Sequence, residues 1–261
     1  MILVHPLINP VIASFGIFQI RWYSIAYVLG FIIGLYLIKF INNNSKNSIK
    51  DKTIENFFIW SIIGVIFGGR LGYMLFYQTK LIYFDPLSIL FIWEGGMSFH
   101  GGLIGLILSI YFYSKKKNIS FFQLSDLISI VAPIGIFFGR IANFINVELY
   151  GRVTNFNFAM IYPTIDNLPR HPSQLYEALF EGIILFAIMY FLHFKKIREQ
   201  IHGINTSFFL ILYGIFRFSL EFLREPDFHI GLYFNFFSIG QLLSIPMVFF
   251  GLIILFRLKK S

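Results

Sequence analysis

Cysteine is absent from this 261-residue sequence. Its absence excludes a disulfide framework, a thiolate metal site and a cysteine nucleophile. Charged residues are also scarce, because they make up 13% of the chain against the ~25% typical of soluble domains. Lysine and arginine are missing from the first ten residues, whereas a secretory signal peptide begins with a positively charged region. We therefore expect no cleaved signal peptide.

Apolar side chains, in contrast, are abundant. Hydrophobic residues account for 57% of the chain, and 35 residues are phenylalanine. A soluble core of this size could not bury so much apolar area, so lipid is expected to be the solvent for most of it. Long apolar runs recur from one end of the chain to the other, which indicates a single integral membrane domain over residues 1–261.

The lengths of the apolar runs predict the fold class. A helix needs about 20 apolar residues to cross the hydrocarbon core, so these runs predict an all-α polytopic bundle of about seven transmembrane helices. The polar connection 147–171, with turn residues such as Gly151 and Pro163, is predicted to form a small external (periplasmic) head. The predicted spans are 20–38, 54–77, 87–113, 124–146, 173–194, 204–222 and 237–256.

The net charge of +8 is distributed along the chain in a way that predicts topology. Lysine and arginine cluster after the first, third, fifth and seventh predicted spans, and these ends all lie on one side of a membrane. By the positive-inside rule that side is the cytoplasm, which places the N-terminus outside and the C-terminus inside a cell inner membrane. We attribute the basic charge to topology and to anionic lipids, and we expect no nucleic-acid partner.

Arg70, Arg140 and Arg217 lie within or near the apolar runs. An arginine at the centre of a membrane helix costs roughly 2.5–3.5 kcal/mol on insertion scales. Acidic partners, a water-filled cavity or an anionic ligand must offset this cost. The three arginines therefore need an explanation, and for Arg70 the neighbouring glycines at 68, 69 and 72 indicate a tightly packed segment.

The polar stretch 139–152 contains the first of two arginine motifs. Arg140 and Asn143 are three positions apart and share a helix face, and Asn146 and Glu148 follow in the external connection. One interpretation is a site for a polar or anionic group. The other is an arginine that extends to the membrane interface beside an asparagine that caps the helix.

The second arginine motif is a stripe formed by Tyr213, Arg217, Glu221 and Arg224 at helical spacing. An ion pair between Arg217 and Glu221 would by itself lower the insertion cost. The pair could also serve a bound anion, with Glu221 orienting Arg217.

Three weaker signals concern His100, the segment 171–177 and Tyr23. A lone histidine at membrane depth usually has a partner and often a role, and a neutral, hydrogen-bonded structural histidine is the alternative. The adjacent Gly101 and Gly105 form a small-xxx-small pattern that predicts helix packing. The segment 171–177 either lines a cavity or starts a helix, and Tyr23 is interpreted as an aromatic anchor at the membrane interface.

Together these motifs resemble a known family. The stretch 139–151 resembles the signature G-R-x-(G/A)-N-F-x-N-x-E-x-x-G of the bacterial phosphatidylglycerol–prolipoprotein diacylglyceryl transferases. The segments 93–105, 171–177 and 213–227 resemble the same family in the expected order, so the resemblance covers essentially the whole chain. Ala142 stands where the family often has glycine, and Ser24 stands where a glycine is common.

The resemblance implies an enzyme of lipoprotein biosynthesis that needs neither metal nor cofactor. Such an enzyme transfers the diacylglyceryl group of phosphatidylglycerol to the thiol of a lipobox cysteine in a prolipoprotein, forms a thioether and releases glycerol phosphate, as the first step of lipoprotein maturation. Because this chain has no cysteine, the thiol belongs to the substrate. The functional positions implied by the resemblance are Tyr23, His100, Arg140, Asn143, Glu148, Gly151, Arg217 and Glu221.

We hypothesise that Arg140 and Arg217 clamp the lipid phosphate, because a guanidinium binds phosphate bidentately and stays charged. His100 is the candidate base for the thiol, and it joins the two arginines as the catalytic candidates. Glu148 is expected to orient Arg140 or Arg152. The substrate-binding candidates are Arg140, Tyr23, Asn143, Asn146, Glu148, Gly151, Tyr213 and Glu221.

Two other classes of protein remain as alternatives. A transporter or channel for an anionic solute also uses intramembrane arginines, often with internal repeats and a site near the midplane, and we find no repeat in this sequence. A membrane scaffold would need neither a buried histidine nor three arginines in apolar runs.

Overall fold

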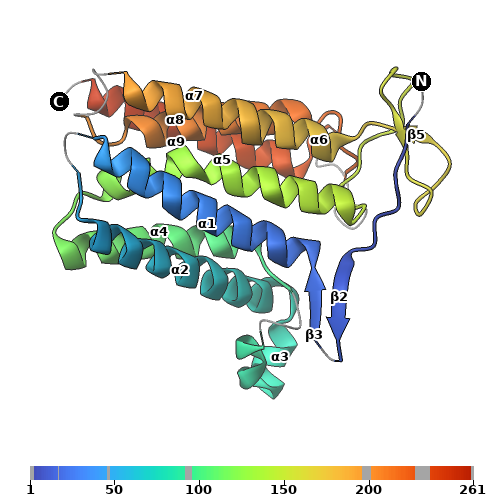
Figure 1. The fold of residues 1–261 in the computed structure, drawn as a ribbon, viewed down its shortest axis with the longest axis horizontal. Helices are drawn as coiled ribbons and strands as arrows, with labels where there is room; N and C mark the ends of the chain where they lie inside the picture. Colours follow the sequence, from blue (N-terminus) through green and yellow to red (C-terminus); the bar gives the residue numbers. More distant parts are fainter. Residues whose placement is uncertain are drawn as a thin grey trace. The chain divides into compact units, whose positions relative to one another are not determined.

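The computed structural model of the protein describes residues 3–16, 18–45, 48–91, 96–195, 201–226 and 236–259. It divides into two compact units (Figure 1). The first unit comprises Met1–Ile38 and Asp126–Ser261, and the second comprises Lys39–Ser125.

The structure confirms a mostly helical, multi-pass membrane protein. Among the described residues, five helices are long and apolar enough to cross a membrane. The predicted sixth span is the shorter apolar helix α8 (Ile204–Leu220), and the predicted third span ends in α4 (Phe99–Lys117), whose last turn carries three lysines. The five long helices are α1 (Trp22–Asn43), α2 (Asp51–Tyr77), α5 (Phe121–Ile145), the continuous helix Ser173–Phe194 and α9 (Ile239–Leu258).

The predicted start of the third span at residue 87 was wrong. A 3₁₀ turn, η1 (Pro86–Leu90), precedes the helix, and Gly96 has a positive φ of 76°. Helix α4 begins only at Phe99, because the Ser98 side chain caps it by accepting a hydrogen bond from the Gly101 backbone N–H at 3.3 Å. Trp93, Glu94 and Gly95 of the sequence motif lie outside the described residues.

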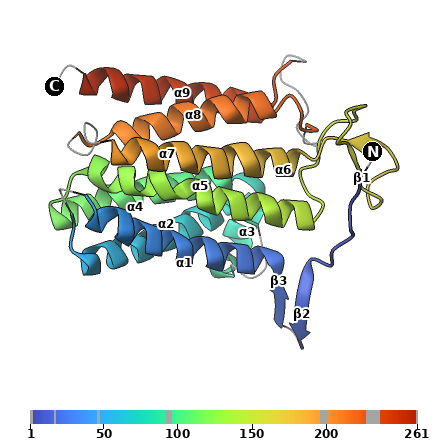
Figure 2. The same cartoon turned by 45° about the horizontal axis from the view of Figure 1, so that its top comes forward.

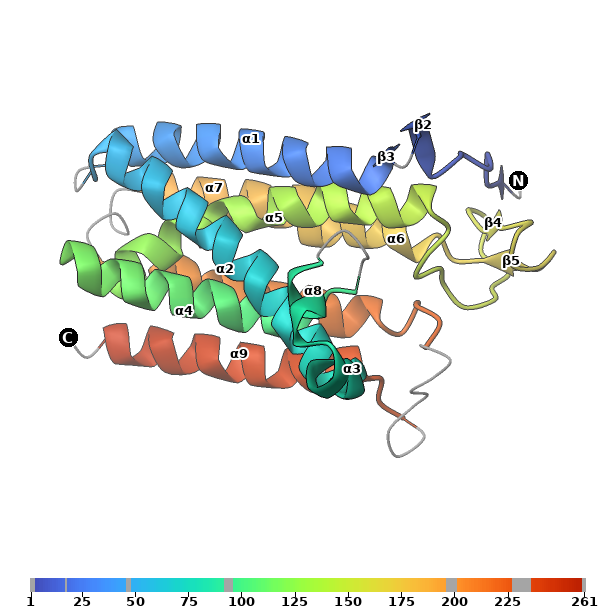
Figure 3. The same ribbon diagram turned by 90° about the horizontal axis from the view of Figure 1, so that it is seen from below.

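In the second unit, α2 crosses α4, and α3 (Thr79–Phe84) follows the end of α2 (Figure 3). Glycines form the crossing: a Cβ on Gly72 would lie 2.8 Å from the Gly101 Cα, and one on Gly68 would lie 2.9 Å from the Gly105 Cα. The predicted packing role of the small-xxx-small pattern is thus confirmed. Arg70 on α2 is buried and donates from Nη2 to the Ser88 carbonyl at 2.7 Å, so it holds the η1 turn.

In the first unit, α8 lies between α7 (Leu185–Phe194) and α9 (Figure 2). Small residues let α8 and α9 approach closely, since the Ser207 hydroxyl donates to the Gly251 carbonyl at 2.7 Å. Asp126, at the start of α5, accepts from the backbone N–H groups of Gly203 and Thr206, both at 2.7 Å. A carboxylate from another helix therefore caps the N-terminus of α8.

The connection 147–171, called the head below, contains short strands, and the N-terminal segment pairs with it. Strand β1 (Leu3–Val4) pairs in parallel with β4 (Met160–Ile161), which pairs antiparallel with β5 (Pro169–Arg170). A separate hairpin, β2 (Val11–Phe15) and β3 (Phe18–Arg21), leads into α1. His5 is buried beneath the head, where Nε2 donates to the Phe144 carbonyl at 3.0 Å and Nδ1 accepts from the Leu7 N–H at 3.2 Å. Burial lowers the pKa of His5, which suits this neutral form.

Candidate active site

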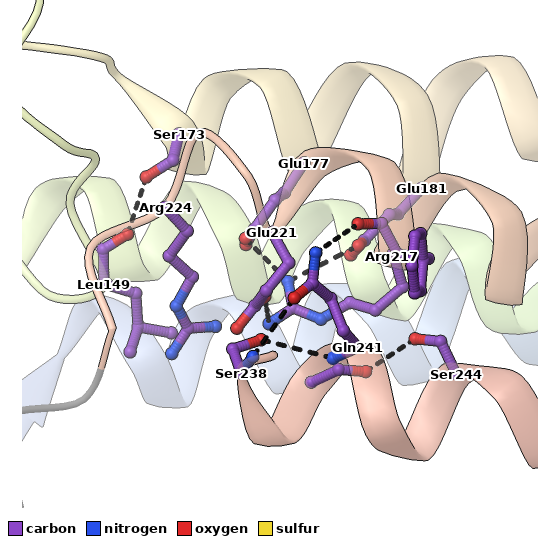
Figure 4. A network of polar contacts seen from close by, with 12 residues as sticks. Leu149, Ser173, Glu177, Glu181, Arg217, Glu221, Arg224, Ser238, Gln241 and Ser244 are labelled. Atoms are coloured by element: carbon purple, nitrogen blue, oxygen red, sulfur yellow. Dashed lines mark hydrogen bonds and ion pairs between the residues drawn. The ribbon is translucent and has the colours of Figure 1, made fainter. Parts of the chain in front are cut away.

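The centre of the first unit holds a buried cluster of charges. Arg140 comes from α5 and Arg217 from α8, while Glu177 ends α6 (Ser173–Glu177) and Glu181 lies in the following π-helical segment η3 (Ala178–Ile184). Both glutamates are fully buried. Figure 4 shows Glu177 and Glu181 directed at Arg217. Four charges therefore meet at a depth where none would be stable alone.

The two glutamates hold the two arginines together. Glu177 contacts Arg140 Nε with Oε2 at 3.0 Å and accepts from Arg217 Nη1 with Oε1 at 2.7 Å. Glu181 contacts Arg140 Nη2 at 3.1 Å and Arg217 Nη1 at 3.6 Å. Each carboxylate thus touches both guanidinium groups, and the guanidinium groups lie side by side despite their like charge.

A change of helix type accompanies this arrangement. The helix that carries both glutamates changes from α to π geometry immediately after Glu177 and returns to α geometry at Leu185. π-Helical turns are rare and occur mostly at functional sites, since they alter the direction of side chains relative to a regular α-helix. Here the wider turn contains Glu181, whose carboxylate meets the same two arginines as that of Glu177.

The polar stripe predicted on α8 is confirmed in part. Arg217 Nη2 contacts Glu221 Oε2 at 2.5 Å, as the spacing of four residues suggested. Tyr213 is buried one turn earlier, with its ring stacked on Phe209 at 5.6 Å. Arg224 is also buried, but α8 ends at Leu220, and Arg224 lies in an antiparallel bridge with Gly151. The predicted stripe therefore holds for Tyr213, Arg217 and Glu221, and its helical extension to Arg224 was wrong.

A second polar group lies beside the N-terminus of α1. The Tyr23 hydroxyl donates to Glu148 Oε2 at 3.2 Å, Asn143 Nδ2 donates to the same oxygen at 3.0 Å, and Asn143 also contacts the Tyr23 hydroxyl. Asn146 Nδ2 donates to Glu148 Oε1 at 3.3 Å.

The backbone turns sharply at Glu148. The residues on either side of it both have positive φ, 57° at Val147 and 56° at Leu149, and this turn directs the carboxylate back toward α5. Among the described residues, the side-chain partners of Glu148 are thus two amides and a phenol, so the prediction that it orients Arg140 or Arg152 was wrong.

Gly151 lies where three backbone segments meet. Its N–H donates to the His171 carbonyl at 2.9 Å, and it forms an antiparallel bridge with Arg224. The next residue, Arg152, donates its N–H to the Leu223 carbonyl at 2.9 Å. A Cβ on Gly151 would lie 2.6 Å from the His171 Cβ and 2.7 Å from the Leu223 oxygen. The absent side chain lets the head and the end of α8 join directly.

Gly151→Ala is expected to force these segments apart and to destabilise the head by roughly 1–3 kcal/mol, the usual cost of overpacking. The measurement is limited proteolysis of residues 147–171 in detergent. Gly135→Ala on α5 is the control, because a Cβ there would meet nothing within 4 Å. Equal cleavage rates in the two variants would contradict the prediction.

A model of the prolipoprotein diacylglyceryl transferase family matches residues 10–257 of this chain. The chain belongs to this family. A phosphatidylglycerol–prolipoprotein diacylglyceryl transferase of Rickettsia typhi is 48% identical over 259 residues, which covers 99% of this chain and 100% of the relative. The protein of the same name in Rickettsia felis is 47% identical over 249 residues, covering 95% and 96% of the two chains.

This member of the transferase family places its candidate residues in different parts of the fold. Arg140 and Arg217 belong to the buried charge cluster, Glu221 contacts it through Arg217, and Tyr213 is buried one turn before Arg217. Gly151 is the backbone junction. The second polar group consists of Tyr23, Asn143, Asn146 and Glu148. His100 belongs to the second unit. It is exposed in the first turn of α4, with its ring edge-on to Phe99 at 5.6 Å, and its role as a base stays a prediction.

Sequence reasoning missed Glu181 and gave Glu177 no specific role. A signal was available, since Glu181 is an acidic residue in the apolar run 178–192, and ionisable residues within membrane helices mark functional sites. Gln174 is a further case: it is fully buried, accepts from the Tyr162 hydroxyl at 3.0 Å and donates to the Glu148 carbonyl at 2.6 Å. It thereby links the head to the turn at Glu148.

Proposed function

We propose that this protein transfers the diacylglyceryl group of phosphatidylglycerol to the cysteine thiol of a prolipoprotein lipobox. The substrate sulfur forms a bond to the glycerol carbon, the carbon–oxygen bond to phosphate breaks, and glycerol phosphate leaves with the electron pair. His100, the candidate base, accepts the proton of the thiol and releases it to water. The observation that carries the proposal is the pair of largely buried arginines, Arg140 and Arg217, in a chain that belongs to this transferase family.

The accessibility of the charges supports a role for the arginines in binding an anion. The side chains of Arg140 and Arg217 keep 15% and 11% of their surface accessible, whereas Glu177 and Glu181 keep none. The carboxylates therefore support the guanidinium groups from the protein side. An arginine held in this way presents oriented N–H groups to a phosphate without reorganisation. Negative charge develops on that phosphate as the leaving group departs, so the N–H groups stabilise the transition state.

The second polar group suits the glycerol part of the lipid head group. Asn143, Asn146 and Glu148 offer amide donors and carboxylate acceptors to hydroxyl groups, and Tyr23 adds a phenol. We assign His100 as the candidate base for the thiol, whose ordinary pKa of ~8.5 leaves little thiolate at neutral pH. No metal or cofactor takes part in this proposal.

We further propose that residues 1–261 act as one membrane-embedded domain in the cell inner membrane. The N-terminus and the head lie on the periplasmic side, and the C-terminus lies in the cytoplasm, because the lysines that end α4 and the basic residues that end α9 favour the cytoplasmic side. The head would then meet prolipoproteins on the outer face of the membrane. Nucleic acid has no part in this function.

The proposal is tested with purified protein, phosphatidylglycerol and a peptide that contains a lipobox cysteine. Mass spectrometry of the peptide should show the added diacylglyceryl group, and a peptide with serine in place of cysteine should stay unmodified. A transporter of anionic solutes is the alternative. Solute flux into protein-containing vesicles, together with an unmodified cysteine peptide, would favour that alternative and contradict the proposal.

Tyr23→Phe is expected to lower the transfer rate about tenfold, because loss of a hydroxyl that bonds a charged partner costs ~1.5 kcal/mol. The hydroxyl contacts Glu148 and Asn143, so its loss frees both side chains from their arrangement. Tyr27→Phe is the matched control: Tyr27 is one turn further along α1, and 58% of its surface is exposed. Equal rates for the two variants would remove Tyr23 from the site.

A further inference from the structure

Gly240, in the first turn of α9, faces the carboxylate of Glu221. A Cβ on Gly240 would lie 2.7 Å from Glu221 Cδ, and 2.8 and 2.9 Å from its two oxygens. These distances are shorter than the contacts that Cβ atoms make with atoms to which they are not bonded. The carboxylate therefore occupies the space that any side chain at position 240 would fill. Figure 4 shows Glu221 extending from the end of α8 toward the start of α9.

Hydrogen bonds fix the backbone at the start of α9. Ser238 and Gln241 form a reciprocal capping box, with bonds of 3.2 Å from the Gln241 N–H to Ser238 Oγ and 3.1 Å from the Ser238 N–H to Gln241 Oε1. The Ser244 hydroxyl donates to the Gly240 carbonyl at 2.7 Å. An added methyl group at position 240 would thus displace the Glu221 carboxylate, the end of a flexible side chain, in preference to the helix.

Glu221 is one of three carboxylates that set the direction of Arg217, and the other two belong to Glu177 and Glu181. Glu221 Oε2 contacts Arg217 Nη2 at 2.5 Å, and the Glu221 side chain is only 6% exposed. The N-terminus of a helix carries a partial positive charge, which favours a carboxylate placed there. The first turn of α9, Glu221 and Arg217 therefore form a connected series that ends at the buried charge cluster.

We propose that Gly240 is a positioning residue for the transfer reaction. Its missing side chain allows Glu221 to lie at the start of α9, where the carboxylate aims the Arg217 guanidinium at the phosphate of the lipid. The inference rests on the proposed function, and it adds a residue from α9, a helix in which the sequence motifs indicated no functional position.

The test is Gly240→Ala in the full-length protein, assayed with phosphatidylglycerol and the lipobox peptide. The rate constant kcat should fall at least about tenfold, because small displacements of a positioned group have large effects on rate. The variant should stay folded in detergent: the displaced carboxylate weakens the pair with Arg217 and lowers the Tm, and alanine, the better helix former, offsets part of that loss. Gly135→Ala provides the control for a glycine-to-alanine change in a helix and should keep the wild-type rate.

A double-mutant cycle with Glu221→Gln separates positioning from a general structural effect. In that background Gly240→Ala should change kcat by less than about twofold, because the charge pair that it misplaces is already gone. A wild-type rate in Gly240→Ala, an unfolded variant, or the same loss in both backgrounds would overturn the inference. A wild-type protein without transferase activity would overturn the proposed function and this inference with it.

Discussion

Replacing Arg140 or Arg217 with lysine is expected to lower the transfer rate at least about a hundredfold and to leave the protein folded. The rate falls because the loss of one oriented donor to a developing anion costs roughly 10²–10³ in rate. Arg140 uses Nε and Nη2 toward two different carboxylates, and Arg217 uses Nη1 and Nη2 in the same way. Lysine keeps the positive charge but has a single nitrogen, which cannot hold two carboxylates and a phosphate in fixed directions.

The measurement is the rate of peptide modification by mass spectrometry, with the Tm in detergent recorded for each variant. Arg21→Lys is the matched control, because Arg21 is exposed at the end of β3 and bonds Gln19. It should keep the wild-type rate. Full activity in both Arg140→Lys and Arg217→Lys would remove the phosphate clamp from the mechanism, whereas unfolding of both variants would show that the guanidinium groups serve stability first.

The second large effect concerns stability. Glu177→Gln should destabilise the protein by about 3–5 kcal/mol, the range found when one partner of a buried ion pair is removed. Glu177 is fully buried and contacts both arginines, at 3.0 and 2.7 Å. With the neutral amide, two guanidinium groups lie close together and one fewer carboxylate balances their charge. The amide NH₂ group is itself a donor, and it would face the N–H donors of Arg140 and Arg217.

Unfolding in detergent, followed as a function of denaturant or temperature, measures this change. Glu225→Gln is the control, because Glu225 pairs with Arg170 at 3.3 Å but keeps 43% of its side chain exposed. Such a pair contributes ~1 kcal/mol or less. Similar losses of stability for the two glutamates would mean that water reaches the cluster around Glu177, which would contradict the assignment of a buried charge network.

The sequence predicted most of the helices for a simple reason. Whether a segment enters lipid depends on its own composition, so each of the predicted spans meets a helix in the structure. The start of the third span was placed too early, because apolar composition does not distinguish a helix from the turn η1. The decisive signals there are local: the positive φ of Gly96 and the cap from Ser98.

The contacts within the candidate site were likewise predictable only where they depend on local sequence spacing. Arg217 and Glu221 are four residues apart, so helix geometry alone predicted their contact. The sequence also indicated that Arg140 and Asn143 share a face. It did not indicate that Glu148 bonds Tyr23, because the two residues are 125 positions apart and nothing local connects them.

The sequence by itself determined that this chain enters lipid, that it carries arginines there, and that its motifs are those of a diacylglyceryl transferase family. Only the tertiary structure decided which carboxylates accompany those arginines. Glu181 meets Arg140 across 41 positions and Glu177 meets Arg217 across 40, and Gly240 meets Glu221 from a separate helix. The physical reason is that the insertion of a segment into the membrane depends on the composition of that segment alone. The cost of burying a charge, in contrast, is offset only by an opposite charge that the packing of other helices brings within about 4 Å.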